Sequence, residues 1–181
     1  MRRALTAVLL AGVAMTSACS RDDEPTPTTT LVVSVAPVGG YATLFELGAD
    51  SAAVVVATAG PARADDVDGM PFTVTDVTVD TVLSGRVSEG SVLPVRQISG
   101  SNVVGGRSQT PPFVETGHQY LLFLAPSELA LGEWVVVGPG QWARDGSASG
   151  TSAFVISVGD EYDGPLPRSL SLDDVRRALG T

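Results

Sequence analysis

The sequence predicts a mainly β fold, a small antiparallel barrel or sandwich with one short helix near residues 44–50 and a second helix at the C-terminus. Three observations carry this prediction. Apolar runs of strand length recur between turns rich in Gly, Pro, Ser and Asp. Helix-start spacing is assigned to two segments, Thr43 to Glu46 and Ser171 to Asp174. The chain is also long enough to bury a core without disulfides, and it has a single cysteine.

The first 18 residues have the order of a secretory signal peptide. Two arginines precede an uncharged, mostly apolar run from Ala4 to Met15, and small residues follow that run. The run is too short to cross a bilayer, which needs about 20 apolar residues. We therefore expect residues 1–18 to be removed during export.

Cys19, the single cysteine, directly follows Thr16-Ser17-Ala18. This junction resembles the lipobox of bacterial lipoproteins, in which the cysteine receives a diacylglyceryl group and becomes the new N-terminus. Thr16 departs from the leucine that is usual in that motif. The resemblance implies that Cys19 is a lipid anchor and that the protein is held at the cell membrane, facing the extracytoplasmic side. The alternative is an ordinary signal peptide cut near Ala18, which leaves Cys19 as a stray thiol.

Residues 19–30 are expected to form a lipidated tether. Apart from two prolines, Ser20 to Thr30 contains no apolar residue, so this segment cannot bury enough surface to offset the entropy of ordering it. We expect a disordered, semi-extended spacer that holds a single domain, residues 31–181, on the order of 30 Å from the bilayer.

The first elements of that domain follow from local pattern. Residues 30–40 are expected to form a strand. Thr43 and Glu46 have the spacing of a capping box, which predicts a short helix over about 44–50. The run SAAVVVATA at 51–59 is almost wholly apolar and predicts a central strand buried on both faces.

The next segment, MPFTVTDVTVDTVLSG, changes phase along its length. Phe72 and Val74 are apolar at even positions, whereas Val77 and Val79 are apolar at odd positions. A change of parity turns side chains to the other face of a sheet, so the pattern predicts a β-bulge near Asp76. Bulges of this kind bend strands where a sheet closes into a barrel.

The remaining strands are expected within residues 91–98, 118–125, 133–146 and 151–159. Pro94 lacks an N–H and so predicts that its strand lies at an edge or contains a break. Ser171 and Asp174 again have capping-box spacing, and Gly180 stands just past the last apolar residue. These signals predict a C-terminal helix over about 172–179.

The order of the phrases LGADSAAVVVATAG, PFTVTDVTVDTVLSG, GSVLPVRQ, GHQYLLFLAP and WVVVGPGQW resembles a class of small exported bacterial domains, many of them actinobacterial. Their framework is similar to the OB-like β-barrel of netrin-like and tissue-inhibitor-of-metalloproteinase modules. The resemblance covers about residues 41–146 and implies an OB-like barrel. It does not extend to the inhibitory mechanism. Those inhibitors reach a zinc ion through a disulfide-bonded N-terminal cysteine, whereas Cys19 has no cysteine to pair with and precedes a tether.

The charge balance argues against partners that are bound through positive charge. The chain has 20 acidic and 11 basic residues, a net charge of −9, which argues against nucleic acid and against anionic lipid surfaces. All of the basic residues are arginine, so chemistry that depends on a lysine nucleophile is excluded. Arginine in place of lysine, with abundant Ala, Gly and Val, is typical of a high-GC bacterium.

Few residues suit catalysis. His118 is the sole histidine and stands at a turn that enters an apolar strand. A catalytic triad would need it to meet a serine and an acid, and no GxSxG segment presents such a serine. We expect His118 to be an exposed turn residue in a non-catalytic protein. The alternative is an envelope hydrolase or another enzyme that uses His118 with nearby acids.

Two acidic segments contain fragments of a calcium loop. Asp65, Asp66 and Asp68 precede Gly69, and three acids lie within 160–163. Calcium takes about six to eight oxygen ligands, including a bidentate glutamate late in a full loop. Neither segment supplies that set, so we expect solvated turn acids, no metal and no other cofactor.

The expected function is therefore binding, to an envelope protein or a glycan. The irregular stretch 99–117 is long for a connection in a compact domain, which favours a functional loop. Of the two tryptophans, Trp142 in its Gly-rich hairpin is the better candidate for exposure, whereas Trp134 begins an apolar run that is typical of core. A purely structural envelope protein is a third alternative. The candidate binding residues are Arg107, Phe113, His118 and Trp142, and a local anion site would need Arg96, Arg107 and Arg144 to come together.

Overall fold

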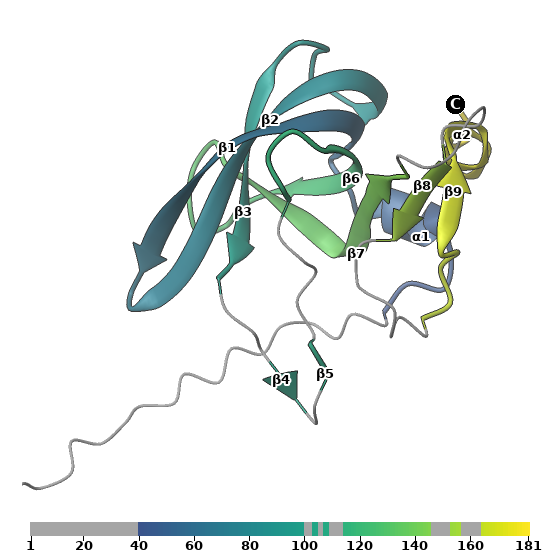
Figure 1. Ribbon diagram of the computed structural model, residues 1–181. Coiled ribbons are helices and arrows are strands. Elements are labelled where there is room, and N and C mark those ends of the chain that lie inside the picture. Colours follow the sequence, from purple (N-terminus) through teal and green to yellow (C-terminus); the bar gives the residue numbers. More distant parts are fainter. Residues whose placement is uncertain (1–39, 100–102, 105–106, 109–113, 146–152, 157–163) are drawn as a thin grey trace, which may run out of the picture. The chain divides into compact units, whose positions relative to one another are not determined.

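The structure, a computed structural model, describes residues 40–99, 103–104, 107–108, 114–145, 153–156 and 164–181. The expected signal peptide, Cys19, the expected tether and all but Gly40 of the segment expected to hold the first strand lie outside these residues. The elements in chain order are α1 (Leu44–Ala49), β1 (Ala53–Val67), β2 (Met70–Gly85), β3 (Val92–Ile98), β4 (Val103–Val104), β5 (Arg107–Ser108), β6 (Gln119–Pro126), β7 (Trp134–Arg144), β8 (Ala153–Ile156), β9 (Ser169–Ser171) and α2 (Leu172–Leu179) (Figure 1).

Five strands close into a ring. β3, β2, β1, β6 and β7 are hydrogen-bonded in that order, and a further pairing between β3 and β7 joins the two ends. Neighbours in the ring are antiparallel except β3 and β7, which are parallel and pair only at Val95 with Trp134 and Arg96 with Val135. A five-stranded barrel closed by a crossover in this way is OB-like. The predicted fold class is confirmed.

β1 is the central strand, and both of its faces are buried, as its continuous apolar run predicts. Val55 and Ala57 point into the ring, whereas Val54 and Val56 point to its outer face. The residues that fill the ring, which we call the barrel core, are Ala53, Val55, Ala57, Ala59, Val77, Val79, Leu93, Val95, Val114, Tyr120, Leu122 and Leu124.

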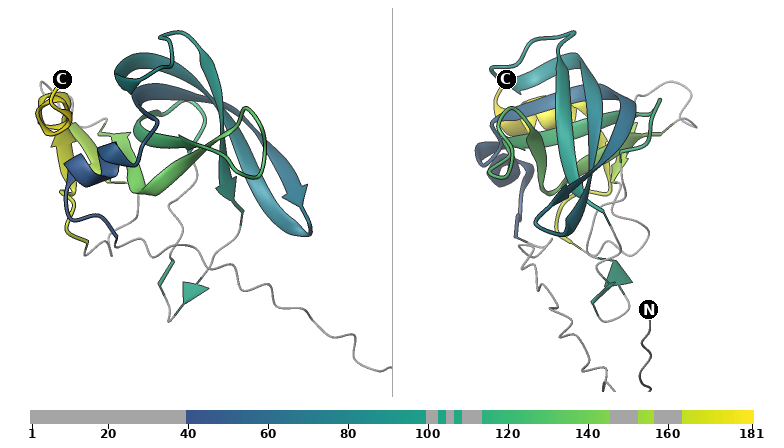
Figure 2. Two further views of the ribbon diagram at one scale, coloured as in Figure 1. Left: turned by 180° about the vertical axis from the view of Figure 1, so that it is seen from behind. Right: turned by 90° about the vertical axis from the view of Figure 1, so that its left-hand side faces the viewer.

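A second core lies on the outer face of β1, β6 and β7. There β8 and β9 extend the sheet beyond β7, and α1 and α2 lie beside them (Figures 1 and 2). Both helices begin with the predicted capping boxes, and α2 ends at Gly180 with φ of 72°. We call this cluster the helix-side core; it consists of Leu44, Leu47, Val54, Val56, Leu83, Leu121, Phe123, Trp142, Phe154, Ile156, Leu166, Leu170 and Val175.

The β-bulge predicted near Asp76 is present in the β1–β2 ladder, but it lies in β1, where Gly60 and Pro61 stand opposite Asp76. β2 pairs with β3 without a break from Phe72 to Thr78, so the odd residues of β2 point into the ring over this whole stretch. Phe72 and Val74 are buried on the outer face instead, while the fully buried Thr75 points inward. The change of parity was assigned to β2 because that interpretation assumes that only one face of the strand is buried, whereas both faces of β2 are buried.

The bulge opposite Asp76 is one of several in this hairpin. Between Ala59 and Ala62, β1 carries the extra residues Gly60 and Pro61 opposite β2. β2 carries its own extra residues at Asp80 and Leu83. These bulges bend the two long strands. Ala53–Thr58 of β1 pairs with β6 in the ring, whereas the turn end of the hairpin extends beyond that pairing.

Pro94 lies in a ring strand, where a proline would ordinarily disrupt the ladder. The N–H of Ser99 donates to the carbonyl of Pro71 in β2, at 2.8 Å, so the odd residues of β3 bond to β2 and the even ones face β7. Pairing with β7 begins only at Val95. The missing N–H of Pro94 therefore faces the side on which no ladder bond is needed.

Trp142, the better candidate for an exposed binding residue, is instead fully buried in the helix-side core. Its Nε1 donates to the carbonyl of Pro167 at 3.1 Å, and its ring lies 5.6 Å from the ring of Phe123 in a tilted arrangement. The glycines beside it do not mark an exposed turn. At Gly140 a Cβ atom would lie 2.6 Å from Cβ of Phe123, so this glycine permits close packing.

We predict that Trp142→Ala lowers the free energy of unfolding by about 3–5 kcal/mol, because it leaves a cavity in a filled core. The matched control is Phe45→Ala, since Phe45 is an aromatic residue that is 66% exposed; its effect should stay within about 0.5 kcal/mol. Urea unfolding measures both. Equal, small losses in the two variants would contradict the burial of Trp142.

Candidate functional site

Of the four binding candidates, the structure describes the side chains of His118 and Trp142, and it places these two in different surroundings. His118 is an exposed turn residue, as the sequence predicts, and its Nε2 lies 3.9 Å from a carboxylate oxygen of Glu115. Trp142 belongs to the helix-side core. Arg107 lies in β5 opposite Val104, and Phe113 falls outside the described residues.

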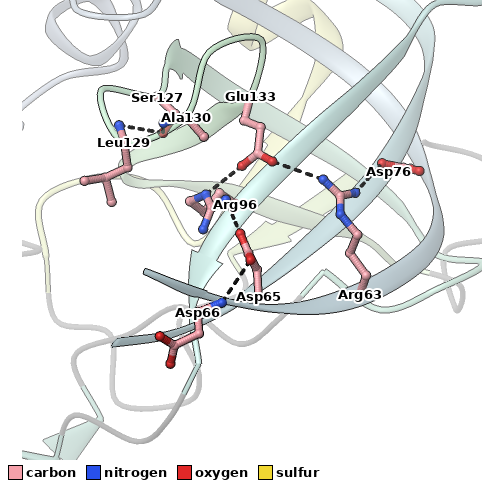
Figure 3. A network of polar contacts seen from close by, with 9 residues as sticks. All are labelled: Arg63, Asp65, Asp66, Asp76, Arg96, Ser127, Leu129, Ala130 and Glu133. Atoms are coloured by element: carbon pink, nitrogen blue, oxygen red, sulfur yellow. Dashed lines mark hydrogen bonds and ion pairs between the residues drawn. The ribbon is translucent and has the colours of Figure 1, made fainter. Parts of the chain in front are cut away.

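The structure instead gathers five charged side chains on the outer face of β1, β2 and β3 (Figure 3). Strand register places four of them on one face, and Glu133 reaches them from the connection between β6 and β7. We call this set the ion-paired face; it consists of Arg63, Asp65, Asp76, Arg96 and Glu133.

Arg96 is the centre of the ion-paired face. Its side chain is only 3% exposed, and its guanidinium carbon lies 4.9 Å from the ring centre of Phe72. Nη2 donates to Asp65 at 2.5 Å and Nε donates to Glu133 at 2.6 Å. Its Nη1 is buried without a hydrogen-bond partner among the residues described. Two carboxylates thus balance a cation that is taken out of water.

Glu133 joins the two arginines. Its second carboxylate oxygen accepts a hydrogen bond from Nη2 of Arg63 at 3.0 Å, and Nη1 of Arg63 pairs with Asp76 at 3.2 Å. One carboxylate therefore links β1, β3 and the start of β7, at the point where the ring closes.

The pKa values of the face follow from these contacts. The hydrogen bond from Arg96 lowers the pKa of Asp65 below its usual value, with help from the backbone N–H of Asp66. Burial alone would lower the pKa of Arg96, but the hydrogen bonds and charges of Glu133 and Asp65 raise it. Asp65 and Arg96 therefore both carry their charges at neutral pH.

The connection between β6 and β7, residues 127–133, is tied at both ends. The N–H of Ser127 donates to the carbonyl of Glu133 at 2.8 Å, and Oγ of Ser127 accepts from the N–H groups of Leu129 and Ala130 at 3.2 and 3.4 Å. The Glu133 carboxylate adds the ion pairs of the face (Figure 3). This ordered turn, which we call the leucine loop, presents Leu129 and Leu131 at 58% and 103% exposure.

The ion-paired face was not predictable as a unit, because its members are far apart in the chain: Arg63 and Glu133 are separated by 70 residues. The sequence analysis considered Arg96 only with Arg107 and Arg144. Arg96 is held by two carboxylates, and Arg144 donates to Gln119 at 2.5 Å. The sequence feature that could have indicated the leucine loop is the presence of two leucines, Leu129 and Leu131, inside the turn-like segment SELALGE.

The calcium-loop fragment is engaged in other contacts. Asp65 pairs with Arg96, and a carboxylate oxygen of Asp66 accepts from the N–H of Gly69 at 2.8 Å. Over the described ranges, the structure brings together no group of three His, Cys, Asp or Glu side chains that would hold a metal ion. The acids within 160–163 lie outside those ranges. No helix among the described residues is long and apolar enough to cross a membrane.

Comparison with protein-family models, with curated proteins and with solved structures found no match. The assignment of an OB-like barrel therefore rests on the strand order and register of this chain alone.

We predict that Asp65→Asn destabilises the protein at pH 7 and that the difference from the unchanged protein shrinks as the solution is acidified. The folded-state pKa of Asp65 is lowered, so its contribution is complete above the unfolded-state pKa, near 3.8, and is lost as the pH falls through the lower folded-state value. Urea unfolding at several pH values between about 7 and 2 measures the difference. Asp68→Asn, in the hairpin turn, is the control. A difference that does not change with pH would count against the ion pair.

Proposed function

We propose that the protein is a lipid-anchored, extracytoplasmic binding module without catalytic activity, and that it contacts an envelope protein through the leucine loop. The anchor is inferred from Cys19 at the end of the signal-like segment. The binding surface is inferred from one observation in the structure, the exposure of Leu129 and Leu131 on a loop that is held at both ends.

The leucine loop suits recognition because it is already ordered. Burial of a leucine side chain in an interface contributes about 1.5–3 kcal/mol. Ser127 and Glu133 hold the loop before any partner arrives, so association does not carry the additional cost of ordering it. Two large apolar side chains exposed next to each other on an ordered turn offer surface that a protein partner would bury.

A protein partner fits this loop better than a membrane or a glycan. Glu128 is exposed beside the leucines, and Glu133, Asp65 and Asp76 lie on the adjoining face, so an anionic bilayer surface would be repelled. Glycan binding commonly uses aromatic faces, and the loop has none. The leucine loop would therefore be complemented by an apolar pocket surrounded by basic residues on another protein.

The anchor is tested with Cys19→Ser in the full chain, expressed in a bacterial host. We expect the unchanged protein to carry a diacylglycerol-sized mass and to partition with membranes, because the lipid supplies the attachment, and the variant to lose both. Intact mass and membrane fractionation measure this. If both proteins are unmodified and free of membrane, the junction is an ordinary cleavage site and the anchor is ruled out.

The loop is tested by photo-crosslinking from position 131 in membranes of cells that produce the full chain. We expect an adduct of one discrete mass, and Leu129→Ser should reduce its yield by about tenfold or more, since one buried leucine is lost. The same probe at position 45, another exposed apolar site, is the control and should not give this adduct. Equal adducts from both positions, or adducts to lipid alone, would refute the loop as the contact surface.

The variant His118→Ala distinguishes the proposed binding function from the alternative, an envelope hydrolase that uses His118. The exposed imidazole makes its closest ion-pair contact with Glu115 and is not part of the leucine loop. We expect the position-131 adduct to be unchanged in this variant. Loss of a hydrolytic activity of the purified protein in His118→Ala would favour the enzyme instead.

A further inference from the structure

The far end of the β1–β2 hairpin has an open edge. β1 pairs with β2 as far as Val67, but its pairing with β6 stops at Thr58. The bulge at Gly60 and Pro61 follows, and from Ala62 to Val67 the described residues place no strand on the other side of β1. This end of the hairpin lies away from α1 and α2 (Figures 1 and 2).

The register identifies the backbone groups that face this edge. The carbonyl of Pro71 accepts from Ser99, next to β3, so Pro71 bonds toward β3 and its partner in β1, Asp66, faces away from β2. By alternation, Ala62 and Ala64 also direct their N–H and C=O groups to the open edge. The N–H of Asp66 is taken by the Asp65 side chain at 2.9 Å. The groups of Ala62 and Ala64 are available for a strand.

The far end of the β1–β2 hairpin is held by its own turn and by ion pairs, without a strand beside β1. Its two-residue turn, Asp68 and Gly69, has positive φ angles of 54° and 81°, as the tight turns that match the twist of a hairpin require. Arg63 and Asp65 are tied to Asp76, Glu133 and Arg96. The open edge is therefore rigid and presented in a fixed register.

The charges along this edge complement themselves. Arg63 and Asp65 share one face of β1, and their side chains are 52% and 41% exposed. In an antiparallel pairing of two identical edges centred on Ala64, Arg63 lies opposite Asp65 of the second copy, and Asp65 lies opposite its Arg63. Each charge then has an opposite charge both across the pair and along its own strand, which stabilises cross-strand pairing.

We propose that the open edge at Ala62–Asp66 pairs with the same edge of a second copy of this chain, so that the two hairpins continue one antiparallel sheet across a twofold axis. The two-fold arrangement is self-complementary. Pro61 and the acids at this edge discourage other strands, as charges and prolines on edge strands do. An antiparallel strand with the order Arg-Ala-Asp places opposite charges across from Arg63 and Asp65, and a second copy of this chain has that sequence.

A pair of cysteine variants tests the register. Both are made in the full chain with Cys19→Ser, which removes the single native thiol. In Ala64→Cys the new residue faces its own copy at a Cα separation of about 5.5 Å, within the range of a disulfide. In Ala62→Cys it faces Asp66 of the second copy and lies about 13 Å from residue 62 of that copy. The two variants differ by two positions on the same exposed edge.

We expect Ala64→Cys to form a disulfide-linked dimer, under mild oxidation and on non-reducing gels, roughly tenfold faster than Ala62→Cys, because pairing raises the effective concentration of the two thiols. Sedimentation of the Cys19→Ser chain at rising concentration should show a monomer–dimer equilibrium. Ala64→Pro, which lacks the central N–H, should weaken it by about tenfold or more. Equal crosslinking of the two cysteine variants, or a dissociation constant unchanged by Ala64→Pro, would overturn the proposal.

Discussion

The closure of the barrel depends on the ion pair between Arg96 and Glu133. β3 and β7 meet through only two residue pairs, Val95 with Trp134 and Arg96 with Val135. A parallel contact this short contributes little by itself, and Glu133 stands immediately before β7, where its carboxylate binds the guanidinium of Arg96 at 2.6 Å. The ion pair therefore reinforces the contact between β3 and the first residues of β7, at the point where the ring closes.

Such a contact is stabilising only if each buried charge is balanced. Arg96 is 3% exposed, and removal of water from a guanidinium is costly unless partners replace it. Asp65 and Glu133 provide two carboxylates, and the ring of Phe72 provides a face below the cation. The loss of either carboxylate would leave a buried, partly unpaired charge, which typically costs about 3–5 kcal/mol. Arg96 is thereby held in ion pairs within the fold.

The same carboxylate connects the fold to the proposed binding surface. Glu133 ends the leucine loop, so the side chain that closes the barrel also fixes the loop that displays Leu129 and Leu131. Arg63, held by Glu133 and Asp76, supports the open end of the β1–β2 hairpin. The two surfaces proposed for contact, the loop and the hairpin edge, are thus both rigid because they share one network of charges.

The elements that could be predicted from the sequence are those whose contacts join residues close together in the chain. The capping boxes at Thr43 and Ser171 define both helices because the bonded groups are three residues apart, and the unbroken apolar run of β1 requires burial on both faces. The alternation of β strands with Gly and Pro turns was enough to indicate a β-barrel or sandwich, since that pattern reflects local backbone geometry.

The contacts between distant parts of the chain could be seen only in the folded protein. The bulge opposite Asp76 lies in β1 and not in β2, because both faces of β2 are buried and Arg96 covers Phe72 on the outer one. Trp142 was misplaced because the helix-side core is assembled from strands and helices distant from it in the chain. The contacts of the ion-paired face span 31, 37 and 70 residues. Burial and ion pairing at such separations depend on how the sheet curls and closes, and no local pattern in the chain records that closure.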